Sequence, residues 1–142
     1  MIITCGPGSY TGERVAMTIA KTLSVISPVK IKVISSLAAY AGKQKCVSVI
    51  DARSQKIFVC AYECGKPLIH EQLLPISDFM EFMKDYEGFD VVGQTQVVNY
   101  PMKEVDLAHH LYILAKDEEA IDNVDALVPR YLKDVEAKKI CL

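Results

Sequence analysis

Residues 6–12 read Gly6-Pro7-Gly8-Ser9-Tyr10-Thr11-Gly12, and residues 13–23 continue as an unbroken run of helix formers. Three glycines and a proline within seven residues indicate a turn whose backbone needs positive φ or a close approach to another group. The apolar residues 2–5, Ile-Ile-Thr-Cys, are typical of the end of a strand. The chain therefore opens with a strand, a glycine-rich turn and a helix.

This order directs backbone N–H groups and a helix N-terminus toward a phosphate or another anion. The spacing, however, matches neither of the common phosphate loops. A Walker A loop ends in Gly-Lys-Ser/Thr, whereas the first lysine after this turn is Lys21. A dinucleotide loop reads G-x-G-x-x-G, and Gly12 comes one residue too late after Gly6 and Gly8. We therefore expect a tight turn that starts a helix, with no bound cofactor. A phosphate loop is the alternative.

Composition indicates one ordinary domain, or two small lobes that share a core. The chain has 142 residues, of which 51% are hydrophobic, and no apolar run has the length of a membrane span. The N-terminus lacks the pattern of a secretory signal, so we expect a cytoplasmic protein without a membrane partner. A net charge of −2 attracts nucleic acid weakly, so another subunit would have to supply most of the positive surface.

The cysteines and histidines do not predict a metal site. Cys60 and Cys64 have three residues between them, not the two of a redox or zinc motif. Positions four apart on a strand share a face, so we expect both thiols to be reduced and to pack as small apolar groups. His109 and His110 are neighbours on a predicted helix and point about 100° apart, so they cannot hold one metal together. We expect one surface histidine and one core histidine.

Catalytic residues are not evident either. Asp51 and Arg53 are a possible acid and its orienting cation, but they fit a strand-end pair on one face better. No Gly-x-Ser-x-Gly nucleophile elbow occurs in the sequence. Because an active site needs several converging groups, we predict no catalytic residue.

Hydrophobic periodicity predicts an alternation of helices and strands. A polar break at residues 42–45 is the predicted boundary between an N-terminal lobe, residues 1–44, and a C-terminal α/β lobe, residues 45–142. A hairpin followed by strand, helix, strand and helix indicates a mixed sheet with flanking helices. The expected helices are 12–26, 36–43, one starting near 79, and 104–117; the strands are 31–34, 46–52, 56–64, 68–74 and 89–92, with an extended tail at 129–133.

The surface of the first helix is where we expect function. It has two neighbouring apolar stripes, which together are wider than one sheet contact needs. The small alanines would let a partner helix approach closely. Alternatively, the whole surface packs on the chain's own sheet, and the pattern alone favours neither. Arg14 lies in the first turn, where a cation opposes the helix dipole, which hints at a partner carboxylate. The stripes are Ala16, Ala20 and Leu23, and beside them Val15, Ile19 and Ile26.

Five blocks of this sequence resemble, in order, those of the TsaB (YeaZ) family, bacterial proteins required for threonylcarbamoyladenosine in tRNA. The resemblance implies an actin-like ATPase (ribonuclease H-like) fold with a truncated first lobe and a second lobe that has a mixed sheet and flanking helices. The blocks are Gly6-Pro7-Gly8-Ser9-Tyr10-Thr11-Gly12 with Arg14 and Ala20-Lys21-Thr22-Leu23; Val33-Ile34-Ser35-Ser36-Leu37-Ala38-Ala39-Tyr40-Ala41; Val49-Ile50-Asp51-Ala52-Arg53 with Lys56-Ile57-Phe58-Val59-Cys60-Ala61-Tyr62; Val91-Val92-Gly93; and Pro129-Arg130-Tyr131-Leu132-Lys133.

The resemblance also implies a function. It implies a non-catalytic scaffold subunit that binds the threonylcarbamoyl transferase TsaD, in a complex that also includes the ATPase TsaE. This subunit itself would contact tRNA only indirectly. In the family, the helix that corresponds to residues 12–26 joins an earlier helix, which has no counterpart in this sequence, in the interface with TsaD or with a second copy, so a homodimer is expected. The implied interface residues are Thr11, Arg14, Val15, Ala16, Ile19, Ala20 and Leu23.

The chain also departs from the family pattern. Family members carry an earlier Asp-Thr/Ser hairpin and a first helix, and in the wider superfamily that hairpin contacts nucleotide phosphates. Either the first lobe is a shortened variant or the sequence starts late, and in both cases we expect no nucleotide binding. Two alternatives stay open. One is an enzyme: a nucleotide-binding protein that uses residues 6–12, or a metallopeptidase-like protein, against which the missing His-x-x-x-His motif argues. The other is a module for self-association only.

Overall fold

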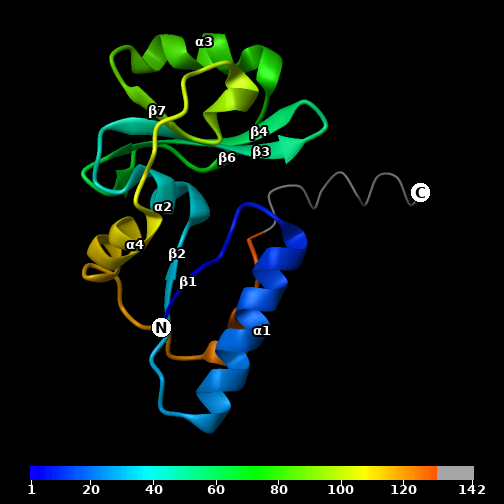
Figure 1. Ribbon diagram of the computed structural model, residues 1–142, viewed down its shortest axis with the longest axis vertical. Helices are drawn as coiled ribbons and strands as arrows, with labels where there is room; N and C mark the ends of the chain where they lie inside the picture. The colour runs from blue at the N-terminus through cyan, green and yellow to red at the C-terminus, as the bar shows by residue number, and fades with distance from the viewer. Residues whose placement is uncertain (131–142) are drawn as a thin grey trace.

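The computed structural model describes residues 1–130, which form a small parallel sheet and a larger mixed sheet with a helix between them (Figure 1). Among these residues, none of the helices combines the length and the apolar character that crossing a bilayer requires. The strands are β1 (Ile2–Thr4), β2 (Lys32–Ile34), β3 (Cys46–Arg53), β4 (Lys56–Glu63), β5 (Lys66–Pro67), β6 (Gln72–Pro75) and β7 (Asp90–Gly93); the α-helices are α1 (Tyr10–Ile26), α2 (Ser36–Ala41), α3 (Phe79–Met83) and α4 (Leu107–Ala115).

The small sheet consists of β1 and β2, which are parallel and place Ile3 opposite Val33. Parallel neighbours need a crossover connection, and α1 supplies it. Helix α1 packs against β1, and α4 packs against both strands. The core of this half of the molecule contains Ile3, Cys5, Met17, Ala20, Ile31 and Leu127.

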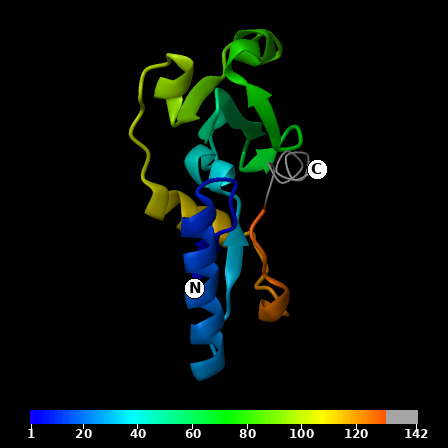
Figure 2. The same cartoon turned by 90° about the vertical axis from the view of Figure 1, so that its right-hand side faces the viewer.

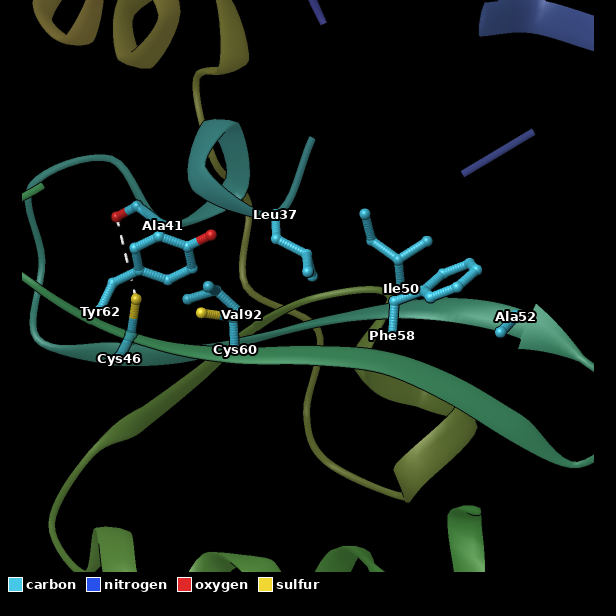
Figure 3. Packing of buried hydrophobic residues seen from close by; sticks show 9 residues of the cluster. All are labelled: Leu37, Ala41, Cys46, Ile50, Ala52, Phe58, Cys60, Tyr62 and Val92. Atoms are coloured by element: carbon cyan, nitrogen blue, oxygen red, sulfur yellow. Dashed lines mark hydrogen bonds between the residues drawn. The ribbon is translucent and has the colours of Figure 1, made fainter. Parts of the chain in front are cut away.

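The large sheet has the strand order β5-β4-β3-β7, and β6 also pairs with β4. The pair β3–β4 is antiparallel and β3–β7 is parallel, so the predicted mixed sheet is confirmed. Helix α2 covers one face of this sheet and α3 lies on the other (Figure 1). Because β3 and β4 are buried on both faces, they read as continuous apolar runs. Figure 3 shows the α2 side of this packing, formed by Leu37, Ala41, Cys46, Ile50, Ala52, Phe58, Cys60, Tyr62 and Val92.

Most predicted elements exist with shifted ends. The predicted helix 36–43 ends at Ala41, because Gly42 has φ of +59°. The predicted helix 104–117 starts after Asp106, whose side chain accepts from the His109 N–H. The predicted strand 68–74 is wrong as a single strand, since β5 and β6 are separated by residues 68–71. Of the predicted tail 129–133, residues 131–133 lie outside the described part.

The predicted lobe boundary separates the two sheets, but the chain later returns to the first one. Leu127 belongs to the core of the small sheet, and Ile121 and Val124 pack against that core. Leu114 and Ala115 of α4 pack with Ile34 of β2. A later segment that folds back cannot be seen in a division by sequence position. The division at residue 44 therefore remains a proposal. It separates the strands of the two sheets, but residues from both predicted lobes pack against the small sheet.

Candidate functional site

The glycine turn packs against a carboxylate of the chain itself, that of Glu13 on α1. A Cβ added at Gly6, where φ is +93°, would lie 2.5 Å from Oε1 of Glu13, and one at Gly8 would lie 3.3 Å from it. Glu13 is only 7% exposed, and its Oε1 has no hydrogen-bond partner within the described residues. Burial raises the pKa of this carboxyl group. A carboxyl group beneath the turn repels a phosphate whenever it is ionised, which supports the interpretation of a tight turn that starts a helix.

The start of α1 is determined by Ser9. Its Oγ accepts a hydrogen bond from the N–H of Gly12 at 3.3 Å, as an N-cap residue does. Helix α1 therefore begins at Tyr10, two residues before the predicted start at residue 12. The Gly6 carbonyl oxygen accepts from the Ser36 N–H at 2.9 Å, which ties the turn to the start of α2.

A cleft of about 630 Å³ lies between the glycine turn, α2 and the β3–β4 hairpin. At its rim the Asp51 Oδ1 accepts from the Arg53 N–H at 2.9 Å, and Oδ2 lies 4.0 Å from the Arg53 Nη1. The Arg53 side chain is otherwise exposed. The two residues form a local pair at the end of a strand, as predicted. The polar side chains of the cleft come from Ser9, Tyr10, Ser36, Tyr40, Asp51, Arg53, Gln94 and Gln96.

The outer face of α1 is a second candidate site. Val15 and Ile19 are each 52% exposed, and Ile26 is also exposed. The Thr18 hydroxyl donates to the Arg14 carbonyl at 2.8 Å, and the Thr22 hydroxyl donates to Thr18 in the same way. These hydroxyls are thus satisfied within the helix, which leaves a mainly apolar surface. A groove of about 420 Å³ runs along it, lined by Tyr10, Thr11, Arg14, Val15, Thr18 and Ile19.

Four of the seven predicted interface residues, Thr11, Arg14, Val15 and Ile19, line this groove. Ala16 and Leu23 are half-buried. The prediction for Ala20 is wrong, because Ala20 is fully buried in the core of the small sheet. Its small side chain lets α1 approach the chain's own sheet rather than a partner.

Arg14 was expected to pair with a carboxylate of a partner protein, but it also has a contact within this chain. The Arg14 Nη1 donates to the Tyr10 hydroxyl at 2.6 Å, and the Arg14 guanidinium lies 5.1 Å from the centre of the Tyr10 ring. Tyr10 was missed because the helix was expected to start later. Thr18 and Thr22 were missed as well, although each lies three residues after an exposed apolar residue, Val15 or Ile19, which is a usable signal.

The thiols follow the prediction in part. Cys60 is buried, and burial raises its pKa to about 11; burial likewise raises the pKa of Cys46 to about 12. Both thiols are therefore protonated and unreactive at neutral pH. Cys64 is exposed, so the prediction that it shares the packing of Cys60 is wrong. The reason is that β4 ends at Glu63, and Cys64 lies in a turn with φ of +53°.

The neighbouring histidines His109 and His110 behave as predicted. His110 is buried, and its Nδ1 lies 2.9 Å from the Ala39 carbonyl oxygen, while His109 is exposed. Within residues 1–130, no group of three or more His, Cys, Asp or Glu side chains is placed to hold a metal ion.

Comparison with known proteins agrees with this fold. The model of the family described as TsaD: tRNA N6-adenosine threonylcarbamoyltransferase matches residues 1–141. The Bacillus subtilis (strain 168) protein named tRNA threonylcarbamoyladenosine biosynthesis protein TsaB is 28% identical over 164 residues, covering 97% of this chain and 71% of the relative.

Two solved structures from Pseudomonas aeruginosa share the fold. An uncharacterized protein with similarity to peptidase YeaZ has a TM-score of 0.71 at 21% identity, covering 93% of this chain and 73% of the other. YeaZ itself has a TM-score of 0.65 at 19% identity, covering 92% and 74%. The fold is thus the actin-like ATPase fold. The chain belongs to the family of tRNA N6-adenosine threonylcarbamoyltransferase TsaD, and within it to the TsaB (YeaZ) members.

Proposed function

We propose that this chain is a non-catalytic subunit in the biosynthesis of threonylcarbamoyladenosine in tRNA, and that it binds and supports a TsaD-type transferase. The observation that carries the proposal is the exposed apolar face of α1. Exposed apolar patches of this kind mark interaction surfaces in soluble proteins. The involvement in this pathway is supported by the printed name of the Bacillus subtilis relative.

The groove suits a partner helix. Val15, Ile19 and Ile26 recur at helical spacing along one side of α1. Their neighbours Thr18 and Thr22 bond to their own backbone, so docking does not leave those hydroxyls unpaired. Arg14 and Tyr10 border the groove and supply a polar rim. An apolar strip with a polar rim is the usual anatomy of a helix–helix interface.

The arrangement of the cleft favours a supporting role over catalysis. Glu13 takes up the space beneath the glycine turn, which disfavours phosphate there. The Asp51 carboxylate at the rim is engaged by Arg53. The enzyme alternative, a nucleotide-binding or metallopeptidase-like protein, therefore has no specific observation in its favour among the described residues.

The same face would serve a second copy of the chain. A homodimer and a complex with the transferase would then compete for α1, so the transferase would displace a copy as it binds. A TsaE-type ATPase would join through the complex. Because the net charge of this chain is −2, tRNA would be held mainly by the other subunits. We place this assembly in the cytoplasm.

The test introduces a glutamate at exposed apolar residues on α1 and, as a control, at one on α3. Val15→Glu and Ile19→Glu should weaken binding to the TsaD-type transferase of the same organism by at least about 100-fold in calorimetry, because a partner helix would bury an unpaired charge. Met80→Glu is the control: Met80 is also exposed but lies on α3, and its substitution should leave the affinity unchanged. Full affinity in both α1 variants, with their folds intact, would contradict the proposed interface.

A further inference from the structure

The Glu71 carboxylate joins three separate parts of the chain. Its Oε1 accepts from the Ser35 hydroxyl at the end of β2 and from the Tyr62 hydroxyl of β4, the latter at 3.2 Å. Its Oε2 accepts from the Arg130 Nη1 at 2.9 Å. The Glu71 side chain is only 11% exposed. One nearly buried carboxylate thus connects the small sheet, the large sheet and the last described residues.

Residues 121–130, which we call the strap, run beside β2 (Figure 2). The Ile121 N–H donates to the Ile31 carbonyl at 2.9 Å, and the Arg130 N–H donates to the Cys5 carbonyl at the same distance. The Lys21 Nζ of α1 donates to a strap carbonyl at 3.3 Å. These anchors tie the strap to the small sheet and to α1. The side chain of Arg130 ties it to Glu71, on the side of the large sheet.

The strap packs against buried groups of the small sheet. Leu127 is buried with Cys5 and Met17 in the core of the small sheet, so the strap closes the inner side of α1. Cys5 and Leu127 also line a cavity of about 450 Å³ that is bordered by Arg130. Apart from the short 3₁₀ turn Val124–Ala126, the strap has no regular structure of its own. Segments of this kind open locally at lower free energy than a core sheet.

We infer that the Arg130–Glu71 ion pair is a latch: it holds the strap closed over Cys5 and the inner side of α1, and its release opens the strap without unfolding the large sheet. The Glu71 carboxylate of this latch accepts hydrogen bonds from the strap, from β4 and from Ser35, the residue that follows β2. Because the strap packs beneath α1, its closure also determines how firmly α1 is seated on the small sheet. This inference concerns the chain by itself and does not depend on the proposed function.

Thiol labelling tests the latch. The chain has five cysteines, of which Cys64 is exposed and Cys141 lies outside the described residues. A background with Cys64→Ser and Cys141→Ser leaves Cys5 as the reporter of the strap, and Cys46 and Cys60 as reporters of the large sheet. Each thiol is followed separately by mass spectrometry during reaction with a maleimide. Labelling of a buried thiol then reports how often its cover opens.

Arg130→Gln should raise the labelling rate of Cys5 at least fivefold and leave Cys46 and Cys60 unchanged. Lys84→Gln is the control: it removes the Lys84–Glu81 pair of 2.6 Å, whose side chains are exposed, on the α3 side of the large sheet and so on the face opposite Cys46 and Cys60. This control should change none of the three rates. An unchanged Cys5 rate in Arg130→Gln would overturn the inference. Equal acceleration of all three thiols would also overturn it, because that pattern reports global unfolding.

Discussion

At the scale of single residues, Glu13 carries an energetic cost. A buried polar atom without a partner costs roughly 1–3 kcal/mol, and the Oε1 of Glu13 has no partner among residues 1–130. The glycines at positions 6 and 8 leave room for the carboxyl group but offer it no side-chain donor. Burial raises the pKa of Glu13, so the folded state favours its neutral form.

The pH dependence follows from this shift. Between the ordinary value of 4.5 and the higher folded pKa, the folded state binds more protons than the unfolded state, so stability falls as pH rises through that window. Glu13→Gln should therefore raise the free energy of unfolding at pH 7, and raise it less at pH 4. Urea titrations at the two pH values measure the difference. An equal gain at both values would show that ionisation of Glu13 is irrelevant.

At the scale of elements, α1 has two faces with opposite roles. Glu13, Met17 and Ala20 are spaced by four and three residues and form its buried side, with Met17 and Ala20 in the core of the small sheet. Val15 and Ile19 face outward. The helix thus packs one side and leaves the other open, and single substitutions can separate the two roles.

Ala20→Glu should unfold the protein or lower its thermal midpoint strongly, because it places a charge in a closed core at a cost of several kcal/mol. Val15→Glu should change the free energy of unfolding of the monomer by no more than about 0.5 kcal/mol. Circular dichroism during heating compares the two. A folded Ala20→Glu variant with an unchanged midpoint would contradict the packing of α1 described above.

At the scale of the whole molecule, two surfaces invite association. Besides the outer face of α1, strand β1 pairs with β2 alone among the described strands, so its other edge is open. An exposed apolar groove and a strand edge without a partner strand both disfavour a lone monomer.

Light scattering should therefore report a dimer at high protein concentration, provided that no transferase is present. Val15→Glu should shift the same sample to the monomer mass, while Met80→Glu should not. A wild-type protein that stays monomeric at millimolar concentration would count against self-association through α1.

Nucleotide binding is the second property of the whole molecule that can be measured. We expect no ATP or GTP binding at physiological millimolar concentrations, since the glycine turn lacks a lysine and contains Glu13. Calorimetric titration should show only heats of dilution. Stoichiometric binding with micromolar affinity would support the enzyme alternative instead.

The sequence by itself determined most elements and the class of the fold. Helix formers after a glycine turn predict α1, and two apolar runs around residues 53–55 predict the β3–β4 hairpin, because such signals are local and depend on short spacings. The five sequence blocks led to the family because they too are local patterns of residues. Burial of both faces of β3 and β4 follows from their continuous apolar runs.

Only the tertiary structure decided which groups meet. The two apolar stripes of α1 are neighbours on the helix surface. The local sequence does not reveal that Ala20 faces inward and Val15 faces outward, because that depends on a sheet built from residues far away in the chain. Glu71 and Arg130 are separated by 59 positions, and no periodicity connects them. The return of Leu127 to the core around Met17 is likewise a long-range contact. Such contacts come from three-dimensional packing, which a pattern of neighbours does not encode.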